Sequence, residues 1–205
     1  RWSKTQDLVM RFEHAAGDKL FVDYAGLTIG ITDRRSGEQR AAQIFVAALG
    51  HSGYTYVEAA ESQQAPQWLA SHVRALEFIG GVPQAIVIDN LKSGVSRAHR
   101  YDPDLNPAYQ DLAAHYALAV LPARVMSPRD KATVENAVLV VERWILAPLR
   151  NRKFFSVAEA NTAITPLLEA LNAAPFQKRE DSRVLVFEQH ERATLRPLPE
   201  RAYQY

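Results

Sequence analysis

The stretch that decides the fold is Ile86-Val87-Ile88-Asp89-Asn90, an apolar run that ends in an aspartate. The β-branched residues at 86–88 favour a strand, and a strand that is apolar on both faces is typical of the interior of an α/β sheet. Ligands of open α/β sheets bind where such strands end, so Asp89 is a candidate functional carboxylate. Asp-Asn is also a good turn sequence, and the pair by itself favours that plainer role.

Length and composition narrow the classes of protein. The 205 residues, 47% of them hydrophobic, are enough for one large domain or for a domain with an appendage. No apolar run is long enough to span a membrane, and no signal peptide is visible. The absence of cysteine excludes disulfides, thiolate catalysis and cysteine zinc sites, and it agrees with a reducing cytoplasm. A net charge of +1 confines any nucleic-acid surface to local patches.

The order of the predicted elements indicates an α/β fold with a mixed sheet and helices packed on its faces. Alternating apolar residues predict strands, and a 3.6-residue period between Gly and Pro signals predicts helices. Strands are expected at 19–24, 27–32, 41–49, 54–59, 86–88 and 118–122, and helices at 66–79, 107–118, 128–147 and 156–171, with Pro166 as a kink. From Asn172 onward we expect an extended arm with four apolar anchors: Val184, Phe187, Leu195 and Leu198.

Two strands carry an aspartate among apolar neighbours. Asp23 shares a strand face with Phe21, and Asp89 ends the central strand. If the two strands are neighbours, the carboxylates lie about 5 Å apart. Like charges that close require a cation between them, and Mg²⁺ prefers oxygen ligands. The pattern therefore predicts a divalent metal site.

A third carboxylate is expected from the helix that begins at Pro128. Glu135 flanks the predicted apolar stripe of that helix and is the candidate. Alone, it is more simply a solvated residue paired with Lys131 at i, i+4. Two strand aspartates followed by a helix glutamate form the layout of a two-metal phosphoryl-transfer site. The stripe opposite Glu135 is expected to consist of Ala137, Val140, Val141 and Trp144.

Four segments together are typical of one protein family: FVDYAG (21–26), GGVPQAIVIDNLKSGV (80–95), HYALAVLPARVMSPRDKATVENAV (115–138) and the tail at 171–199. They resemble the retroviral-integrase-like catalytic core of DDE transposases, and in particular the IstA-type transposases of bacterial insertion sequences. The 45 residues between Asp89 and Glu135 (90–134) exceed the retroviral spacing, and we assign the extra length to the loop at 91–106.

The resemblance implies an RNase H-like fold with a mixed five-stranded sheet and a metal triad of Asp23, Asp89 and Glu135. It also implies a Mg²⁺-dependent polynucleotidyl transferase, with Mn²⁺ as a substitute, that hydrolyses transposon ends and joins the 3′ hydroxyl to target DNA. A homo-oligomer on DNA, a companion AAA+ ATPase and a bacterial, nucleoid-associated location are implied as well. Two alternatives stay open: a nuclease that only hydrolyses, and a catalytically silent DNA-binding or assembly module.

The resemblance also suggests how the chain divides. We expect a linker or short helix at 1–17, the catalytic core at 18–150, and a C-terminal helix with its arm at 151–205. The start at Arg1, without Met and without a helix-turn-helix candidate, suggests a core excised from a longer protein.

Basic residues gather in the segments next to the carboxylates. A ring of them around a metal site favours phosphate contacts over a scattered solvated surface. The candidates are Lys92, Arg97, Arg100, Arg124, Arg129 and Lys131. A second cluster beyond the catalytic helix, Arg150, Arg152 and Lys153, is expected to touch flanking DNA. Basic residues of the arm have either that role or a role in binding a partner subunit: Lys178, Arg179, Arg183, Arg192 and Arg196.

Overall fold

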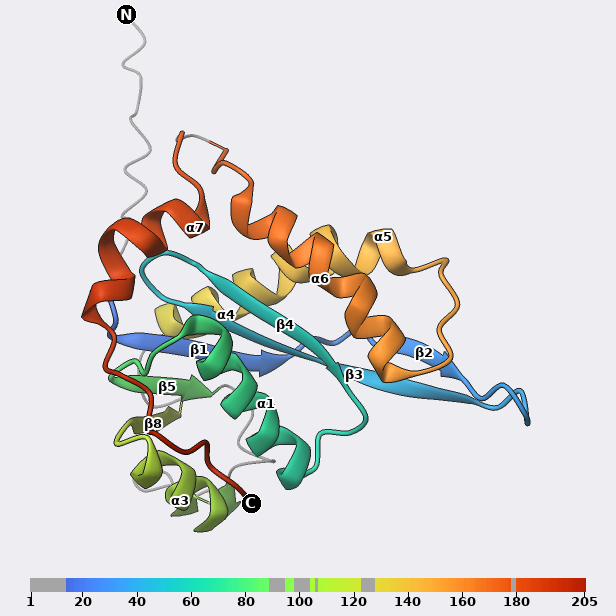
Figure 1. Cartoon of the computed structure of the whole chain (residues 1–205), viewed down its shortest axis with the longest axis horizontal. Helices are drawn as coiled ribbons and strands as arrows, with labels where there is room; N and C mark the ends of the chain where they lie inside the picture. Colours follow the sequence, from blue (N-terminus) through green and yellow to red (C-terminus); the bar gives the residue numbers. More distant parts are fainter. Residues whose placement is uncertain (1–13, 89–94, 98–103, 106, 123–127, 178–179) are drawn as a thin grey trace, which may run out of the picture.

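The computed structural model (Figure 1) describes residues 14–88, 95–97, 104–105, 107–122, 128–177 and 180–205. Its centre is a mixed sheet in which β1 has β3 on one side and β5 on the other. β3 is antiparallel to both β1 and β4, whereas β1, β5 and β8 run parallel to one another. The strands are β1 (Lys19–Tyr24), β2 (Ile29–Thr32), β3 (Gln39–Leu49), β4 (Thr55–Ala60), β5 (Ala85–Ile88) and β8 (Ala119–Pro122).

The sheet has six strands rather than the five expected, and the difference comes from an interruption in one of them. β1 pairs with β3 up to Tyr24, and β2 pairs with the same strand from Ile29 onward. The backbone N–H of Ala25 still donates to Ile44 of β3, at 2.8 Å. β2 therefore continues the path of β1 along β3, and the sheet remains five strands wide. A separate two-stranded ribbon joins β6 (Val95–Arg97) to β7 (Asp104–Leu105).

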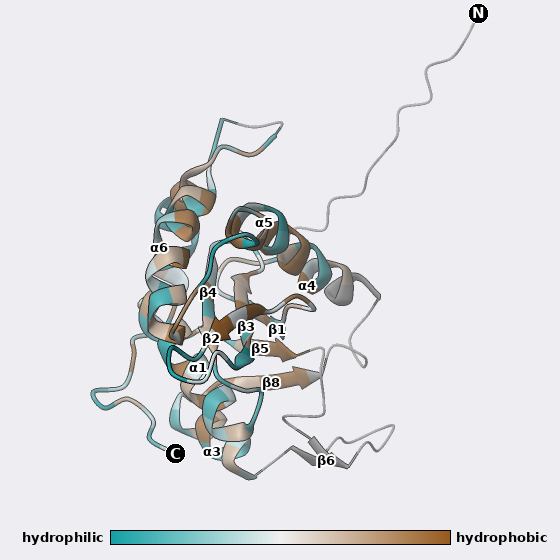
Figure 2. Cartoon of the chain, turned by 90° about the vertical axis from the view of Figure 1, so that its right-hand side faces the viewer, coloured by the Kyte–Doolittle hydropathy of each residue, from teal (hydrophilic) through white to brown (hydrophobic). Residues whose placement is uncertain are grey.

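Strand alternation divides the interior into two cores. On one face of β1, the side chains of Leu20 and Val22 point toward the helices α1 (Ala65–Ile79) and α3 (Pro107–His115). The opposite face of the sheet is covered by α4 (Pro128–Val141), by a π-helical segment η1 (Glu142–Leu146) with α5 (Ala147–Leu149), and by α6 (Val157–Ala173). Coloured by hydropathy, the strands are mostly apolar between these layers (Figure 2). The helices thus bury both faces of the sheet, as expected of an α/β fold.

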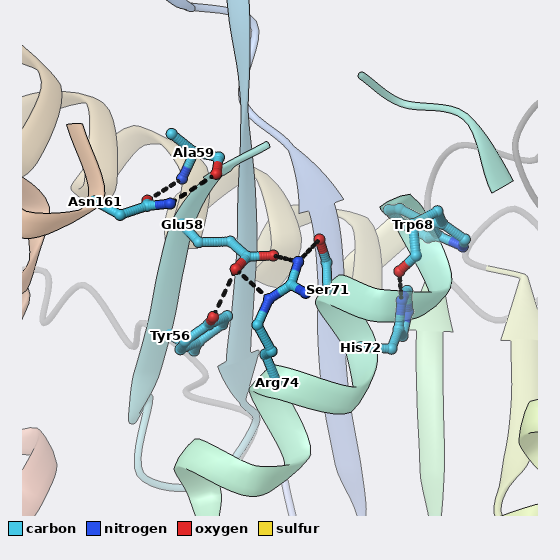
Figure 3. Close-up of polar contacts among 8 residues, drawn as sticks. All are labelled: Tyr56, Glu58, Ala59, Trp68, Ser71, His72, Arg74 and Asn161. Carbon is cyan, nitrogen blue, oxygen red and sulfur yellow. Dashed lines mark hydrogen bonds and ion pairs between the residues drawn. The ribbon is translucent and has the colours of Figure 1, made fainter. Parts of the chain in front are cut away.

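Buried polar side chains connect α1 to the sheet (Figure 3). Glu58 of β4 is 6% exposed, and its carboxylate accepts two hydrogen bonds of 2.7 Å from the Arg74 guanidinium. The Tyr56 hydroxyl donates to the same carboxylate at 2.8 Å. Two residues earlier in α1, His72 is fully buried, and its ring lies between the Trp68 carbonyl and the Tyr109 hydroxyl. Each of these buried groups has a partner, which removes the cost of desolvating it unpaired.

The C-terminal segment is helical at residues 183–194, where an extended arm was expected, whereas residues 195–205 are not helical. It forms α7 (Arg183–Val186), η2 (Phe187–Glu191) and a 3₁₀ turn, η3 (Arg192–Thr194). The fully buried Glu191 accepts hydrogen bonds from the backbone N–H groups of Gly17 and Ser52, at 3.1 and 3.0 Å. Since these two donors lie more than a hundred residues away, only tertiary contact explains the local helix. Three of the expected anchors do join the first core: Phe187, Leu195 and Leu198.

The apolar stripe of α4 also differs from the expectation. Val141 is buried as expected, but Trp144 is 50% exposed. The backbone N–H of Ala147 donates to the Glu142 carbonyl, an i→i+5 bond that adds one residue to the turn. This π turn rotates Ile145 and Leu146 into the core instead of Trp144.

Candidate active site

The candidate site begins where β1 and β5 run side by side. The two strands are parallel, and their last paired residues are Val22 and Ile88. Asp23 follows the first of these and Asp89 follows the second in the sequence. Asp89 itself lies outside the described residues. The register shows that the residues just before these two positions, Val22 and Ile88, are paired on adjacent strands, and parallel neighbours lie about 4.8 Å apart.

Helix α4 crosses the face of the sheet to which Asp23 belongs. Val134 of α4 is 2% exposed and packs against Phe21 of β1 and Val87 of β5. Because alternate residues of a strand point to the same face, Phe21 and Asp23 both lie beneath this helix. Glu135 follows Val134 directly and is exposed. The contact through Val134 thus brings the helix that carries Glu135 over the β1–β5 pair.

The direction of α4 brackets Asp23 between two contacts. Val134 packs on Phe21. Farther along the same helical path, Glu142 lies close to Gly26, since a Cβ added to this glycine would be 3.9 Å from Glu142 Oε1. The helix therefore runs beside β1 in the same sense as the strand. In the sequence, Asp23 lies between Phe21 and Gly26, the two residues that α4 approaches. The part of α4 beside Asp23 is therefore Glu135 and the turn that follows it.

The Asp23 carboxylate is half-buried, as the apolar pattern around it predicts. Its Oδ1 accepts a hydrogen bond from the Tyr24 backbone N–H at 2.8 Å. Among the described residues no three His, Cys, Asp or Glu side chains come together as metal ligands. Carboxylate oxygens from Asp23 and Glu135 are nevertheless the donor type that Mg²⁺ and Mn²⁺ accept. The residues present therefore fit a hard divalent cation.

The predicted basic residues fall into three groups. Lys92, Arg100 and Arg124 lie outside the described residues. Arg97 lies in β6, and Arg129 and Lys131 lie in the first turns of α4, the helix that carries Glu135. The second cluster is exposed but lies after α5, beside β2 and away from Asp23: Arg150, Arg152 and Lys153. The structure thus separates this cluster from the carboxylates.

Three basic residues of the C-terminal segment bind the protein itself. Arg183 donates to the Leu171 carbonyl at 3.3 Å, and Arg192 forms an ion pair with Glu188 at 2.7 Å. The Arg196 guanidinium donates to the carbonyls of Ala117 and Pro83, at 2.7 and 2.8 Å. The contacts of Arg183 and Arg196 hold the C-terminal segment against the core, whereas the Arg192 ion pair lies within the segment, and all three arginines have partners within the protein. Lys178 and Arg179 lie outside the described residues.

With this geometry in view, the family match is clear. The family model of the integrase core domain matches residues 14–128, a range that includes Asp23 and position 89 and ends before Glu135. The chain belongs to the integrase core domain family. It is 50% identical over 198 residues to putative transposase y4bL/y4kJ/y4tB of Sinorhizobium fredii, and 45% identical over 203 residues to the putative transposase for insertion sequence IS408 of Burkholderia multivorans.

These alignments cover 97% and 99% of this integrase core chain but only 38% and 39% of the two relatives. Solved structures confirm the fold at low sequence identity. The magnesium complex of the HTLV-2 integrase catalytic core domain matches 85% of this chain and 99% of its own, with a TM-score of 0.56 and 13% identity. The simian T-cell lymphotropic virus intasome, in complex with the PP2A regulatory subunit B56 gamma, matches 95% of this chain and 61% of its own at a TM-score of 0.61 and 14% identity. The RNase H-like fold predicted from the sequence is thereby confirmed.

No helix in the described part of this integrase core is long and apolar enough to cross a membrane. The longest, α6, has 17 residues and carries several polar side chains on its exposed face.

Proposed function

We propose that this chain is the catalytic core of a DNA transposase and that Asp23, Asp89 and Glu135 hold its divalent metal ions. The observation that carries the proposal is the parallel pairing of Val22 with Ile88 beneath α4. It brings the carboxyl ends of the first strand and the central strand side by side, under the helix that bears the third acid. The family and its transposase relatives supply the substrate class, a DNA phosphodiester.

Each part of the chain has a separate task in this proposal. Asp23, Asp89 and Glu135 would hold Mg²⁺, or Mn²⁺ in its place, and the bound metal would supply activation of the attacking oxygen and stabilisation of the leaving oxygen of the phosphodiester. Asp23 is positioned by β1, whose backbone is paired on both sides and therefore rigid. Glu135 is positioned by the packing of Val134 on Phe21 and Val87. Arg129 and Lys131, in the same helix, are proposed to contact phosphates next to the reacting one.

The reaction we propose has two steps at one site. Water first attacks a phosphodiester at the transposon end, and the freed 3′ hydroxyl then attacks target DNA. We further propose that the protein acts as a homo-oligomer on DNA together with a companion AAA+ ATPase, in the bacterial cytoplasm. Since the relatives are more than twice as long as this chain, recognition of the transposon ends is assigned to the rest of such a protein.

The test is metal-dependent joining of labelled DNA ends, with Mn²⁺ binding by calorimetry as a readout independent of activity. Asp23→Asn, Asp89→Asn and Glu135→Gln should each lower joining at least about 100-fold, because metal stabilisation of the transition state is worth several kcal/mol. Each should also weaken Mn²⁺ binding, while the melting temperature without metal holds or rises as repulsion between the acids falls.

Glu142→Gln is the matched control, since this acid lies two turns farther along the same helical path. Loss of joining in Glu142→Gln with normal joining in Glu135→Gln would show that the third acid is misassigned. Nicking without joining would identify a nuclease instead, and DNA binding without either reaction would identify a silent module.

A further inference from the structure

The structure brings together two basic segments that are more than a hundred residues apart in the sequence. One is the β2–β3 hairpin, with Arg34, Arg35 and Arg40, and the other is the turn between α5 and α6. Ile31 forms a parallel bridge with Phe154, and the Thr32 N–H donates to the Phe154 carbonyl at 2.8 Å. In Figure 1 the chain between α5 and α6 passes beside β2 accordingly. We call the six exposed cations of this surface the basic platform: Arg34, Arg35, Arg40, Arg150, Arg152 and Lys153.

Two arginines of the basic platform are held by adjacent phenylalanines. The Arg34 guanidinium lies over the Phe155 ring, 4.1 Å from its centroid, and that of Arg152 lies 5.2 Å from the centroid of Phe154. Phe154 is fully buried, so its ring is a fixed support. Stacking restricts the arginine side chains before any ligand arrives, which lowers the entropy lost on binding. The guanidinium forks stay available, because these contacts use their faces rather than their N–H groups.

The basic platform carries more positive than negative charge, since its six cations lie with three acids: Asp33 and Glu38 of the hairpin, and Glu61, which lines a pocket with Arg40. None of the six cations forms an ion pair with a described residue. Asp33 is used by the turn: its Oδ1 accepts from the backbone N–H groups of Arg35 and Ser36, at 2.8 Å each. These hydrogen bonds hold the Asp33 pKa below its ordinary value, the larger effect coming from Ser36. Asp33 therefore stays ionised as a structural part of a compact hairpin tip.

The basic platform lies on the line of the strand that carries Asp23. Asp23 pairs with Val46 of β3, and Thr32, at the base of the hairpin, pairs with Gln39 of the same strand. Gln39 and Val46 are seven residue steps apart in β3, which corresponds to about 24 Å along the strand. At about 3.4 Å per base pair, this distance spans about seven base pairs of duplex DNA. Figure 2 looks at this end of the molecule, where hydrophilic loops face the viewer.

We propose that the basic platform is a second DNA-backbone contact, which holds the duplex about seven base pairs from the reacting phosphate. The proposal rests on the proposed function for the position of the reacting phosphate, whereas the phosphate-binding chemistry follows from the platform itself. Arginine forks on a rigid support suit phosphate oxygens, and they carry no base specificity. The platform would thus orient DNA at the site without choosing its sequence.

The first experiment measures the salt dependence of binding of this chain to a random 30-base-pair duplex. Each phosphate contact contributes about 0.9 to the slope of log K against log salt. Arg34→Ala with Arg152→Ala should therefore lower the slope by about two, and Arg34→Lys with Arg152→Lys should restore most of it. Arg201→Ala, an exposed arginine of the C-terminal end, is the matched control. A slope unchanged by the double alanine variant overturns the proposal.

The second experiment maps where the duplex lies, and it uses the absence of cysteine in the chain. Iron–EDTA attached at Asn151→Cys should cleave a branched DNA that mimics the joined product about seven base pairs from the junction. The same probe at Glu200→Cys is the control. Cleavage centred elsewhere, or equal from both probes, overturns the placement.

The triad and the platform fail separately. A lowered slope with full joining by the triad variants would contradict the proposed function while the platform remains. Lost joining in the triad variants with an unchanged slope would contradict the platform alone.

Discussion

Protonation of His72 should set the acid limit of stability of this domain. The ring is fully buried between α1 and the sheet, and burial lowers the pKa of His72 from 6.5 to about 4. Its Nδ1 lies 2.7 Å from the Trp68 carbonyl, which only an N–H can serve, and its Nε2 lies 2.9 Å from the Tyr109 hydroxyl. The neutral ring satisfies both partners, because Nε2 then accepts from Tyr109. A second ring proton would remove that acceptor.

The sign of the effect follows from the two pKa values. Between pH 6.5 and 4 the unfolded chain binds a proton at this ring and the folded chain does not. The contribution of the neutral His72 ring to the free energy of unfolding is therefore fully present above pH 6.5 and is lost as the pH falls toward 4. A difference of about 2.5 pKa units corresponds to about 3 kcal/mol of unfolding free energy.

The assay is urea unfolding followed by tryptophan fluorescence at pH 7.5, 6, 5 and 4, for the wild type and for His72→Gln. The variant should be less stable at pH 7.5, and the gap should narrow by about 3 kcal/mol toward pH 4, since glutamine does not titrate. His190→Gln, an exposed histidine, should follow the wild type. A gap between wild type and His72→Gln that is constant from pH 7.5 to 4 would refute the reasoning.

Two further predictions concern interactions that connect helices to the sheet and to their own ends. Arg74→Met leaves the Glu58 carboxylate buried without its cation and should cost about 2 kcal/mol of unfolding free energy, a value reduced because Arg74 is 43% exposed. Adding Glu58→Gln should recover more than half of the unfolding free energy that Arg74→Met loses. If chemical denaturation shows instead that the losses of the two single variants add in the double variant, the pair is not coupled. Ser156 accepts from the Glu159 N–H at 3.0 Å as the N-cap of α6, so Ser156→Ala should cost about 1 kcal/mol. The control Thr165→Ala, on the exposed face of α6, should cost less in the same thermal melts.

The strands and most helix ends were predictable from the sequence because their signals are local. The helix expected after Pro66 ends where Gly80 adopts a φ of 75°, a conformation that residues with a Cβ rarely adopt. The apolar run at 86–88 is a fully buried strand between two parallel neighbours, as its composition on both faces indicated. Asp23 and Asp89 could be named as candidates because each stands next to an apolar strand sequence, but their adjacency was expected only if the two strands are neighbours.

Other features were not predictable, because their causes lie far away in the chain. Trp144 was assigned to the core by a 3.6-residue period, which a single π turn shifts by one residue. The C-terminal segment was expected to be extended because it is rich in prolines and charges. The hydrogen bonds that Glu191 accepts from the N–H groups of Gly17 and Ser52 connect it to the rest of the chain. A buried carboxylate with two backbone donors cannot be recognised from the sequence, where it looks like any surface acid.

The sequence by itself determined the alternation of strands and helices, the family and the three candidate carboxylates, because periodicity and short motifs are encoded in neighbouring residues. Only the tertiary structure decided which strands pair and which helix covers them. The parallel register of Val22 with Ile88 turns two separate aspartates into one candidate site. The bridge from Ile31 to Phe154 turns a hairpin and a distant turn into one basic surface. Pairing of this kind depends on how the whole chain packs to bury its apolar faces, and no local signal carries that information.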